Sequence, residues 1–353
     1  MKKTIRRWGI HSTLYAANPW AVIAGSIREQ ITTDSDQRAA QSFVSQAHEY
    51  FRAAEQSSTI ETRPLLYYYS FLNLGKAIAI ARGRPNIVGR VRHGIAAVDA
   101  SGHAVSGAEL VVQASARDRS VIQVVDELHR ALENSPVLAT TYPVGEILAQ
   151  SVVGHRMWRE GHESPPKERF IAVDDIRFFY DKGSKVVWSR VYVRRSTLKA
   201  RERGVAETLR ESQLESKFHA VKEPDAARGK AFHTFEQTVP TSYTGRAADV
   251  VMDIVADLRA NLWETITSAR PYRRFYLYLS PANELRMPQW LSAYSTLFWL
   301  GSLTRYQPVE LLDALDGPLG PFLREFLETQ PTQLLYFMAS EAKKQDVARA
   351  AIV

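Results

Sequence analysis

Two stretches of the chain are hydrophobic on nearly every side of a helix, and they dominate the pattern of apolar and polar positions. The first, RPLLYYYSFLNLGKAIAIAR, predicts a helix over residues 64–82, and the second, QWLSAYSTLFWLGSLTRY, predicts one over residues 289–306. A proline in the first turn suits each start, and a nearby glycine or proline ends each one. Helices this apolar are surrounded by protein. We therefore expect them to pack together in one core built from the N-terminal and C-terminal parts of the chain.

The middle of the chain has another pattern, in which short apolar groups alternate with polar residues between about residues 84 and 198. Residues 167–198 predict a β-hairpin around Asp181–Ser184, with alternate residues of each strand on opposite faces. We predict an α+β fold that is mainly α, with an antiparallel β region in the middle. The expected parts are an N-terminal helical part (1–83), a mixed β/α middle region (84–244) and a C-terminal helical part (245–353) that packs on the first.

A stripe of polar residues interrupts the first apolar helix. Tyr69, Asn73 and Lys76 follow one another at i, i+4 and i+7, so one face of the helix carries all three. A lysine there is costly unless it reaches the surface, pairs with a structural acid or lines a wet cleft. The second apolar helix ends with Arg305 and Tyr306, and neither helix contains an aspartate or a glutamate. Two cations without a local acid favour an anion as their partner.

Composition narrows the class of protein. The 353 residues carry a formal net charge of +7, with basic residues spread along the chain, which fits either a solubilising surface or a polyanion partner. Cysteine is absent, which excludes disulfides, thiolate metal sites and cysteine nucleophiles. No apolar run of the sequence reaches the ~18 residues that a membrane-spanning helix needs. We expect a cytoplasmic protein with no membrane partner.

Common catalytic motifs are missing from the sequence. It contains no GxxxxGK[ST], GxGxxG, GxSxG or HExxH pattern, so P-loop, Rossmann, serine-hydrolase and zinc-protease interpretations have no support. We expect no cofactor and no metal site. The acids Asp174 and Asp175, with Lys182 or Lys185 across the hairpin, loosely resemble the acidic sites of restriction-type nucleases. An ordinary hairpin with a polar turn is the interpretation that we favour for them.

One pair of residues offers an enzymatic alternative. Arg156 and His162, with five residues between them, resemble the R-x4–6-H pair of higher-eukaryote-and-prokaryote nucleotide-binding (HEPN) ribonucleases. In such a pair the histidine acts as general acid or base and the arginine stabilises charge on the phosphate. This resemblance implies a metal-independent ribonuclease with Arg156 and His162 as catalytic residues. The same spacing arises readily by chance in an arginine-rich chain.

The two apolar helices also carry a family resemblance. The segment Tyr68–Ala77 fits a YYSxLNLxKA motif, and Ser302, Arg305, Tyr306 and Pro308 fit an S-x-x-R-Y-x-P motif. Together with His93-Gly94, these segments resemble the YaaC-like protein family of bacteria over most of the chain. The resemblance implies no particular chemistry. Because some members lie near mobile or defence-related genes, it implies a defence or regulatory context.

Taken together, these patterns predict a protein that binds an anionic ligand, a nucleotide or an RNA phosphate, in a helical cleft. The alternative is the HEPN-like ribonuclease described above. The partners to test are a nucleotide, RNA and a second copy of the chain. The ligand-binding residues that we expect are Tyr69, Asn73, Lys76, His93, Arg305 and Tyr306.

Overall fold

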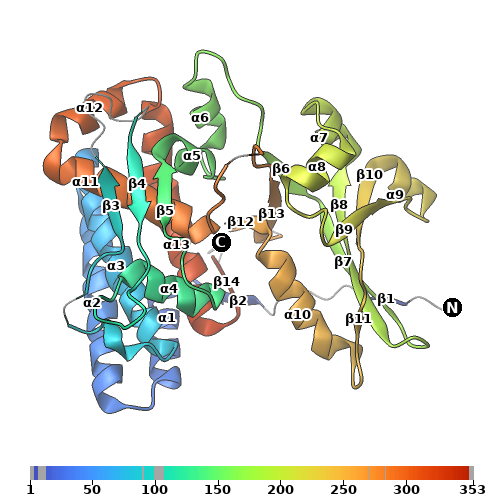
Figure 1. Cartoon of the computed structure of the whole chain (residues 1–353), viewed down its shortest axis with the longest axis horizontal. Helices are drawn as coiled ribbons and strands as arrows, with labels where there is room; N and C mark the ends of the chain where they lie inside the picture. Colours follow the sequence, from blue (N-terminus) through green and yellow to red (C-terminus); the bar gives the residue numbers. More distant parts are fainter. Residues whose placement is uncertain are drawn as a thin grey trace. The chain divides into compact units, whose positions relative to one another are not determined.

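A computed structural model describes residues 4–6, 13–89, 91–98, 107–269, 271–282 and 284–349 (Figure 1). In these ranges the protein is α+β and mainly α, as the sequence predicts. Its residues form two compact units: unit 1 contains residues 1–12 and 166–286, and unit 2 contains residues 13–165 and 287–353. Every helix in the described ranges is too short or too polar to cross a membrane.

Unit 2 is built around the two apolar helices, α3 (Arg63–Ala81) and α11 (Gln289–Tyr306). Both are buried along most of their length and pack on each other, which confirms the predicted core. Leu72, Leu297 and Leu300 are among the buried side chains. The other helices of this unit are α1 (Pro19–Gln30), α2 (Asp34–Gln56), η1 (Ile60–Thr62), η2 (Pro85–Ile87), α4 (Val124–Glu133), α5 (Val144–Ala149), α6 (His155–Glu160), α12 (Pro308–Asp316) and α13 (Gly320–Lys343).

The local sequence accounts for where these helices begin and end. The side-chain oxygen of Asn18 accepts hydrogen bonds from the backbone amides of Trp20 and Ala21, at 3.1 and 3.3 Å, and so caps α1. Pro64 occupies the first turn of α3, where its missing N–H costs little. That helix stops just before Gly83, whose φ of 77° lies in the left-handed region that glycine adopts readily.

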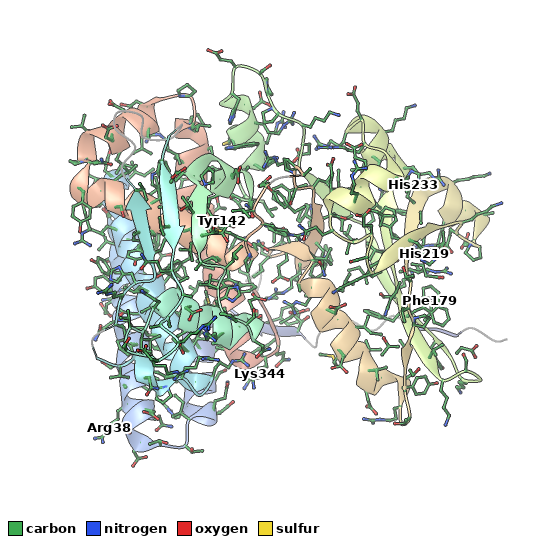
Figure 2. All side chains as sticks on the ribbon, in the orientation of Figure 1. Arg38, Tyr142, Phe179, His219, His233 and Lys344 are labelled. Atoms are coloured by element: carbon green, nitrogen blue, oxygen red, sulfur yellow. The ribbon has the colours of Figure 1, made fainter. Side chains whose placement is uncertain are left out.

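Two small sheets complete unit 2. The strands β3 (Ile95–Val98), β4 (Glu109–Val112) and β5 (Thr140–Pro143) form an antiparallel sheet in that order, so β3 is an edge strand among the described residues. Tyr142 of β5, labelled in Figure 2, is buried. The second sheet is a parallel pair of β2 (Thr13–Ala16) and β14 (Asp346–Arg349).

Unit 1 is organised by an antiparallel sheet with the strand order β1-β7-β8-β10-β9. Its centre is the predicted hairpin of β7 (Asp175–Asp181) and β8 (Val186–Arg194), in which Asp175 is paired with Tyr192. Val191 and Val193 of β8 point into a hydrophobic core, as the alternation predicts. The remaining elements are β1 (Thr4–Arg6), β6 (Phe170–Val173), α7 (Arg195–Ala200), α8 (Val205–Glu211), β9 (Phe218–Val221), α9 (Ala226–Ala231), β10 (Phe232–Gln237), β11 (Thr241–Ser242), α10 (Ala247–Arg259), β12 (Leu262–Ile266) and β13 (Arg273–Tyr278).

The two units differ from the three parts that we expected. The sheet β3-β4-β5 belongs to the helical unit rather than to a middle region, and α10 belongs to unit 1 rather than to a C-terminal helical part. Strands also continue past residue 198, because β13 pairs with both β6 and β12. Ile171, Leu258 and Leu277 share one hydrophobic core. Residues 166–286 therefore bury apolar surface against one another, which is the physical basis of this division.

Candidate functional site: a cationic cavity beside the two apolar helices

The helices α3 and α11 approach each other closely at Gly301. A Cβ atom at this position would lie 3.4 Å from the Cα atom of Leu65 and 3.5 Å from the Cβ atom of Tyr68. Tyr68 also packs edge-on against Tyr294 and Phe298, with ring centroids 5.6 and 5.2 Å away. Aromatic contacts of this geometry add to the burial energy. They fix the position of α3 on α11.

A cavity of about 570 Å³ adjoins this contact, and all of the residues that line it belong to unit 2. Its walls are formed by Tyr68 of α3, residues 92–98 leading into β3, Glu109 of β4, and α11 from Phe298 to Tyr306. A cavity of this volume has the size typical of small-molecule sites.

Positive charge gathers at the cavity. Arg92, His93 and Arg305 line it, together with one acidic residue, Glu109. The Arg305 guanidinium donates a hydrogen bond from Nη1 to the hydroxyl oxygen of Tyr69 at 2.9 Å. Among the described residues, no carboxylate forms an ion pair with Arg92 or Arg305. The cavity therefore has more positive charge than its walls neutralise.

Lys76 of α3 adds a further cation near the cavity. Its side chain is half-buried, and burial lowers its pKa. The ammonium nitrogen lies 5.1 Å from the ring centroid of Phe43, a weak cation–π contact. It has neither a carboxylate nor a hydrogen-bond acceptor in the part of the chain that the structure describes. Lys76 is thus a half-buried cation whose countercharge these residues do not supply.

His93 and Tyr68 form a hydrogen-bonded pair at the cavity wall. The Tyr68 hydroxyl and Nδ1 of His93 are 2.7 Å apart. Burial is the main cause that lowers the pKa of His93, and the charges of Lys76 and Arg305 lower it further. Because the ordinary pKa of histidine is about 6.5, this imidazole is mostly neutral at pH 7. Burial also raises the pKa of Tyr68, so its hydroxyl stays protonated and holds the imidazole by a neutral hydrogen bond.

The structure brings five of the six expected ligand-binding residues into one neighbourhood. His93, Arg305 and Tyr306 line the cavity. Tyr69 and Lys76 do not line it, but Tyr69 is hydrogen-bonded to Arg305, and the charge of Lys76 acts on His93. These contacts connect α3, α11 and the segment before β3.

Asn73 and Tyr68 occupy places that differ from our expectation. Asn73 is buried on α3 and does not line the cavity. Tyr68, which we did not select, lines it and contacts His93. A signal for Tyr68 was present, because it stands next to Tyr69 in the YYS motif, but helical geometry places the two side chains on different faces.

Arg156 and His162 do not line the cavity. The side chain of Arg156 on α6 is 87% exposed, and its Nε atom is 3.9 Å from Glu160. His162 is also exposed, and its Nδ1 atom donates a hydrogen bond to the backbone carbonyl oxygen of Trp158 at 2.8 Å. The ribonuclease hypothesis for this pair stays a prediction.

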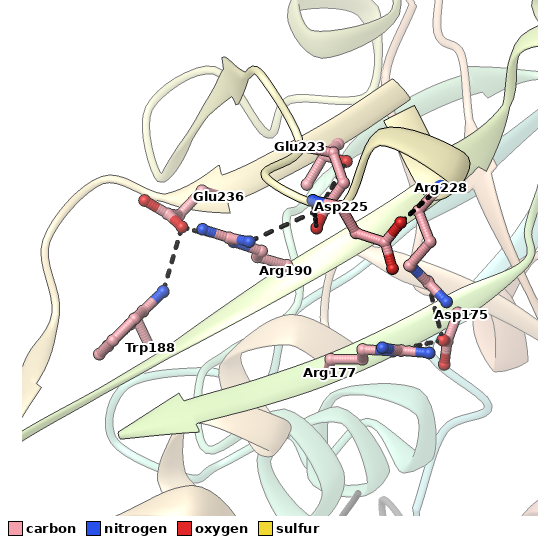
Figure 3. A network of polar contacts seen from close by, with 9 residues as sticks. Asp175, Arg177, Trp188, Arg190, Glu223, Asp225, Arg228 and Glu236 are labelled. Atoms are coloured by element: carbon pink, nitrogen blue, oxygen red, sulfur yellow. Dashed lines mark hydrogen bonds and ion pairs between the residues drawn. The ribbon is translucent and has the colours of Figure 1, made fainter. Parts of the chain in front are cut away.

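In unit 1, by contrast, carboxylates neutralise the arginines of the sheet (Figure 3). Arg190 is 2.5 Å from a carboxylate oxygen of Glu236 and 3.5 Å from one of Glu223. Arg228 pairs with Asp175 at 3.1 Å. These charges are matched inside the network, so they leave no excess positive charge for a ligand.

The aspartates of the nuclease-like hairpin also form ion pairs with arginines of the same unit. Asp174 pairs with Arg194 at 2.9 Å, and Asp175 pairs with Arg177 at 2.7 Å. Within the described residues, no group of three or more His, Asp and Glu side chains could hold a metal ion. The interpretation of this hairpin as an ordinary one therefore fits its contacts.

These observations define a mainly helical α+β protein whose helical unit holds a cavity with unmatched positive charge. The family model described as YaaC-like Protein matches residues 11–342, nearly the whole chain. The chain therefore belongs to the YaaC-like protein family, as the motifs of the two apolar helices predict. Comparisons with curated proteins and with solved structures gave no match.

Proposed function

We propose that the cavity of unit 2 binds an anionic ligand through a phosphate group, as part of a nucleotide or of RNA. The observation that carries this proposal is the missing countercharge. Among the described residues, no carboxylate pairs with Lys76 or Arg305, although both charges act on the same imidazole, that of His93. Arg84 of the same unit, in contrast, lies 3.0 Å from a carboxylate oxygen of Glu127. A bound anion would offset the cost of holding two cations close together.

The donors suit a phosphate in particular. The guanidinium of Arg305 presents a planar fork of N–H groups, and the Tyr69 hydroxyl limits its orientation. The ammonium of Lys76 adds a point charge with three donors. A neutral His93 can donate or accept one further hydrogen bond, depending on its tautomer.

Tyr306 supports a nucleotide or RNA over inorganic phosphate. Its side chain lines the cavity and is 70% exposed, and the guanidinium carbon of Arg305 lies 4.8 Å from its ring centroid. Exposed aromatic rings beside a phosphate site commonly stack on nucleic-acid bases. Such a ligand would also suit the regulatory or defence context that the family resemblance implies.

The test is a binding measurement with the full chain and an Arg305→Gln variant. Fluorescence anisotropy with a labelled single-stranded RNA, and competition by nucleoside monophosphates, report affinity directly. Loss of a hydrogen bond to a charged group costs about 1.5–3 kcal/mol, so we expect the dissociation constant to rise roughly 10- to 150-fold.

Arg324→Gln is the matched control for this measurement. Arg324 lies on α13 of the same unit, pairs with Asp316 at 3.3 Å and does not line the cavity. This variant should bind like the wild-type chain. If the wild type binds neither RNA nor nucleotide, or if both variants lose affinity equally, the proposed function is wrong.

A further inference from the structure

We infer that the same cavity cleaves the RNA that it binds, with His93 as the general base in a transesterification at an RNA phosphodiester. This inference rests on the proposed function, because the RNA phosphate must first be held by Arg305 and Lys76. It goes further in naming a reaction, a substrate class with a 2′-hydroxyl group, and a base that is separate from the Arg156–His162 pair.

The position of His93 meets the geometric requirement for a base. It lines the cavity, and one of its two ring nitrogens is already bound, since Nδ1 lies 2.7 Å from the Tyr68 hydroxyl. In the tautomer whose Nδ1–H donates to the Tyr68 oxygen, the lone pair of Nε2 is free to accept a proton. A partner on the far ring nitrogen is also the usual way to fix the orientation of a catalytic imidazole.

The charges around His93 keep it in the form that a base needs. Tyr68 and Lys76 act on it from α3 and Arg305 from α11, and Glu109 of β4 lines the same cavity. Burial and the two cations lower the pKa of His93, so it is neutral and able to accept a proton at pH 7. The bound RNA phosphate, an anion, would partly restore the basicity of the ring.

The two cations have the charge that the transition state requires. Phosphoryl transfer places additional negative charge on the non-bridging phosphate oxygens, and fixed cations, Arg305 at the cavity wall and Lys76 close by, stabilise it. Arg305 can donate two hydrogen bonds to these oxygens.

The proposed step balances without a protein nucleophile. Nε2 of His93 takes the proton of the 2′-hydroxyl, and the 2′-oxygen forms a bond to phosphorus. The bond between phosphorus and the 5′-oxygen breaks, and the leaving 5′-oxygen takes a proton from a water molecule, which becomes hydroxide. The products are a 2′,3′-cyclic phosphate and a 5′-hydroxyl end, after which His93 gives its proton to the hydroxide and is neutral again.

The test uses the full chain, a 5′-labelled single-stranded RNA, and the same strand with 2′-O-methyl groups. We expect cleavage of the RNA to a 2′,3′-cyclic phosphate and no cleavage of the methylated strand. His93→Gln should lower the cleavage rate at least about 100-fold, the effect typical of losing a general base, while binding of the methylated strand changes less than about threefold. His219→Gln, an exposed histidine of unit 1 (Figure 2), should cleave like the wild type.

The pH dependence of the cleavage rate distinguishes a general base from a residue that only supports the fold. The rate should rise with pH through the lowered pKa of His93 and then level off, whereas binding should weaken as His93 deprotonates. Thermal melting of His93→Gln and His93→Asn shows whether each variant is folded. If the RNA binds but stays intact, or if folded His93 variants cleave at the wild-type rate, the inference is overturned and the binding proposal survives. If His162→Gln alone abolishes cleavage, the inference is overturned in favour of the Arg156–His162 pair.

Discussion

Replacing Lys76 with methionine should change stability and binding in opposite directions. Methionine keeps the unbranched apolar stem of lysine and removes the ammonium. In the free protein this ammonium is half-buried, and burial lowers its pKa, which means that the charged form is less favourable in the folded state than in the unfolded state. Lys76→Met should therefore raise the free energy of unfolding, by about 0.5–2 kcal/mol, the range of other stabilising substitutions.

The same substitution should weaken binding of the phosphate-bearing ligand. Without the ammonium, a bound phosphate loses one charge-assisted hydrogen bond, and about 1.5–3 kcal/mol corresponds to a roughly 10- to 150-fold higher dissociation constant. The pKa of His93 should also rise, because one of the two cations that lower it is gone. Chemical denaturation measures the first effect, RNA anisotropy the second, and an NMR titration of the histidine ring protons the third.

Lys343→Met is the control for this prediction. Lys343 lies on the surface of the same unit, at the end of α13, and pairs with Glu29 at 2.8 Å. A surface ion pair contributes ~0–1 kcal/mol, so this variant should lose a little stability and keep both its RNA affinity and the pKa of His93. If Lys76→Met destabilises the protein by more than Lys343→Met does, Lys76 has a partner that stabilises it. Our account of the cavity would then be refuted.

Two further predictions concern the structure that supports the cavity. Leu72 on α3 is 4% exposed, so Leu72→Ala should lower the free energy of unfolding by ~2–5 kcal/mol. A loss below ~1 kcal/mol in urea denaturation would contradict the assigned core. Burial would raise the pKa of Asp126 on α4, but hydrogen bonds from the Val137 amide, the Arg130 guanidinium and the Ser115 amide outweigh it and lower that pKa. The stability that the Asp126 carboxylate contributes is therefore present above the ordinary aspartate pKa of about 4 and is lost as pH falls through the lowered value. Asp126→Asn should be less stable than the wild type at pH 7. It should also lose less stability than the wild type between pH 5 and pH 2, as thermal melts can check.

The two core helices could be predicted from sequence because their limits are local. The proline and glycine residues that begin and end α3 act within one turn, so the predicted range 64–82 and the observed Arg63–Ala81 nearly coincide. The predicted range 289–306 is the observed range of α11. Because both helices are hydrophobic on nearly every side, the sequence also indicated that they are buried. It further indicated that they pack on each other.

The cavity and the two units could not be predicted in the same way, because they depend on contacts between distant residues. Only the fold places His93 against Tyr68, 25 positions earlier. Likewise, nothing near residues 170–173 indicates that they pair with residues 275–278, more than 100 positions later. The polar stripe of α3 shows the same limit, because Tyr69, Asn73 and Lys76 do not line the cavity wall and Asn73 is buried.

The long gap between α3 and α11 has a consequence for synthesis on the ribosome. α3 ends at Ala81 and α11 begins at Gln289, so at 5–20 residues per second the first helix waits ~10–40 s for its partner. During that interval the α11-facing side of one of the most apolar helices of the chain is uncovered, while residues 166–286 of unit 1 emerge and can fold. Nascent chains stalled before residue 289 should accordingly recruit chaperones, and those stalled well beyond residue 306 should release them.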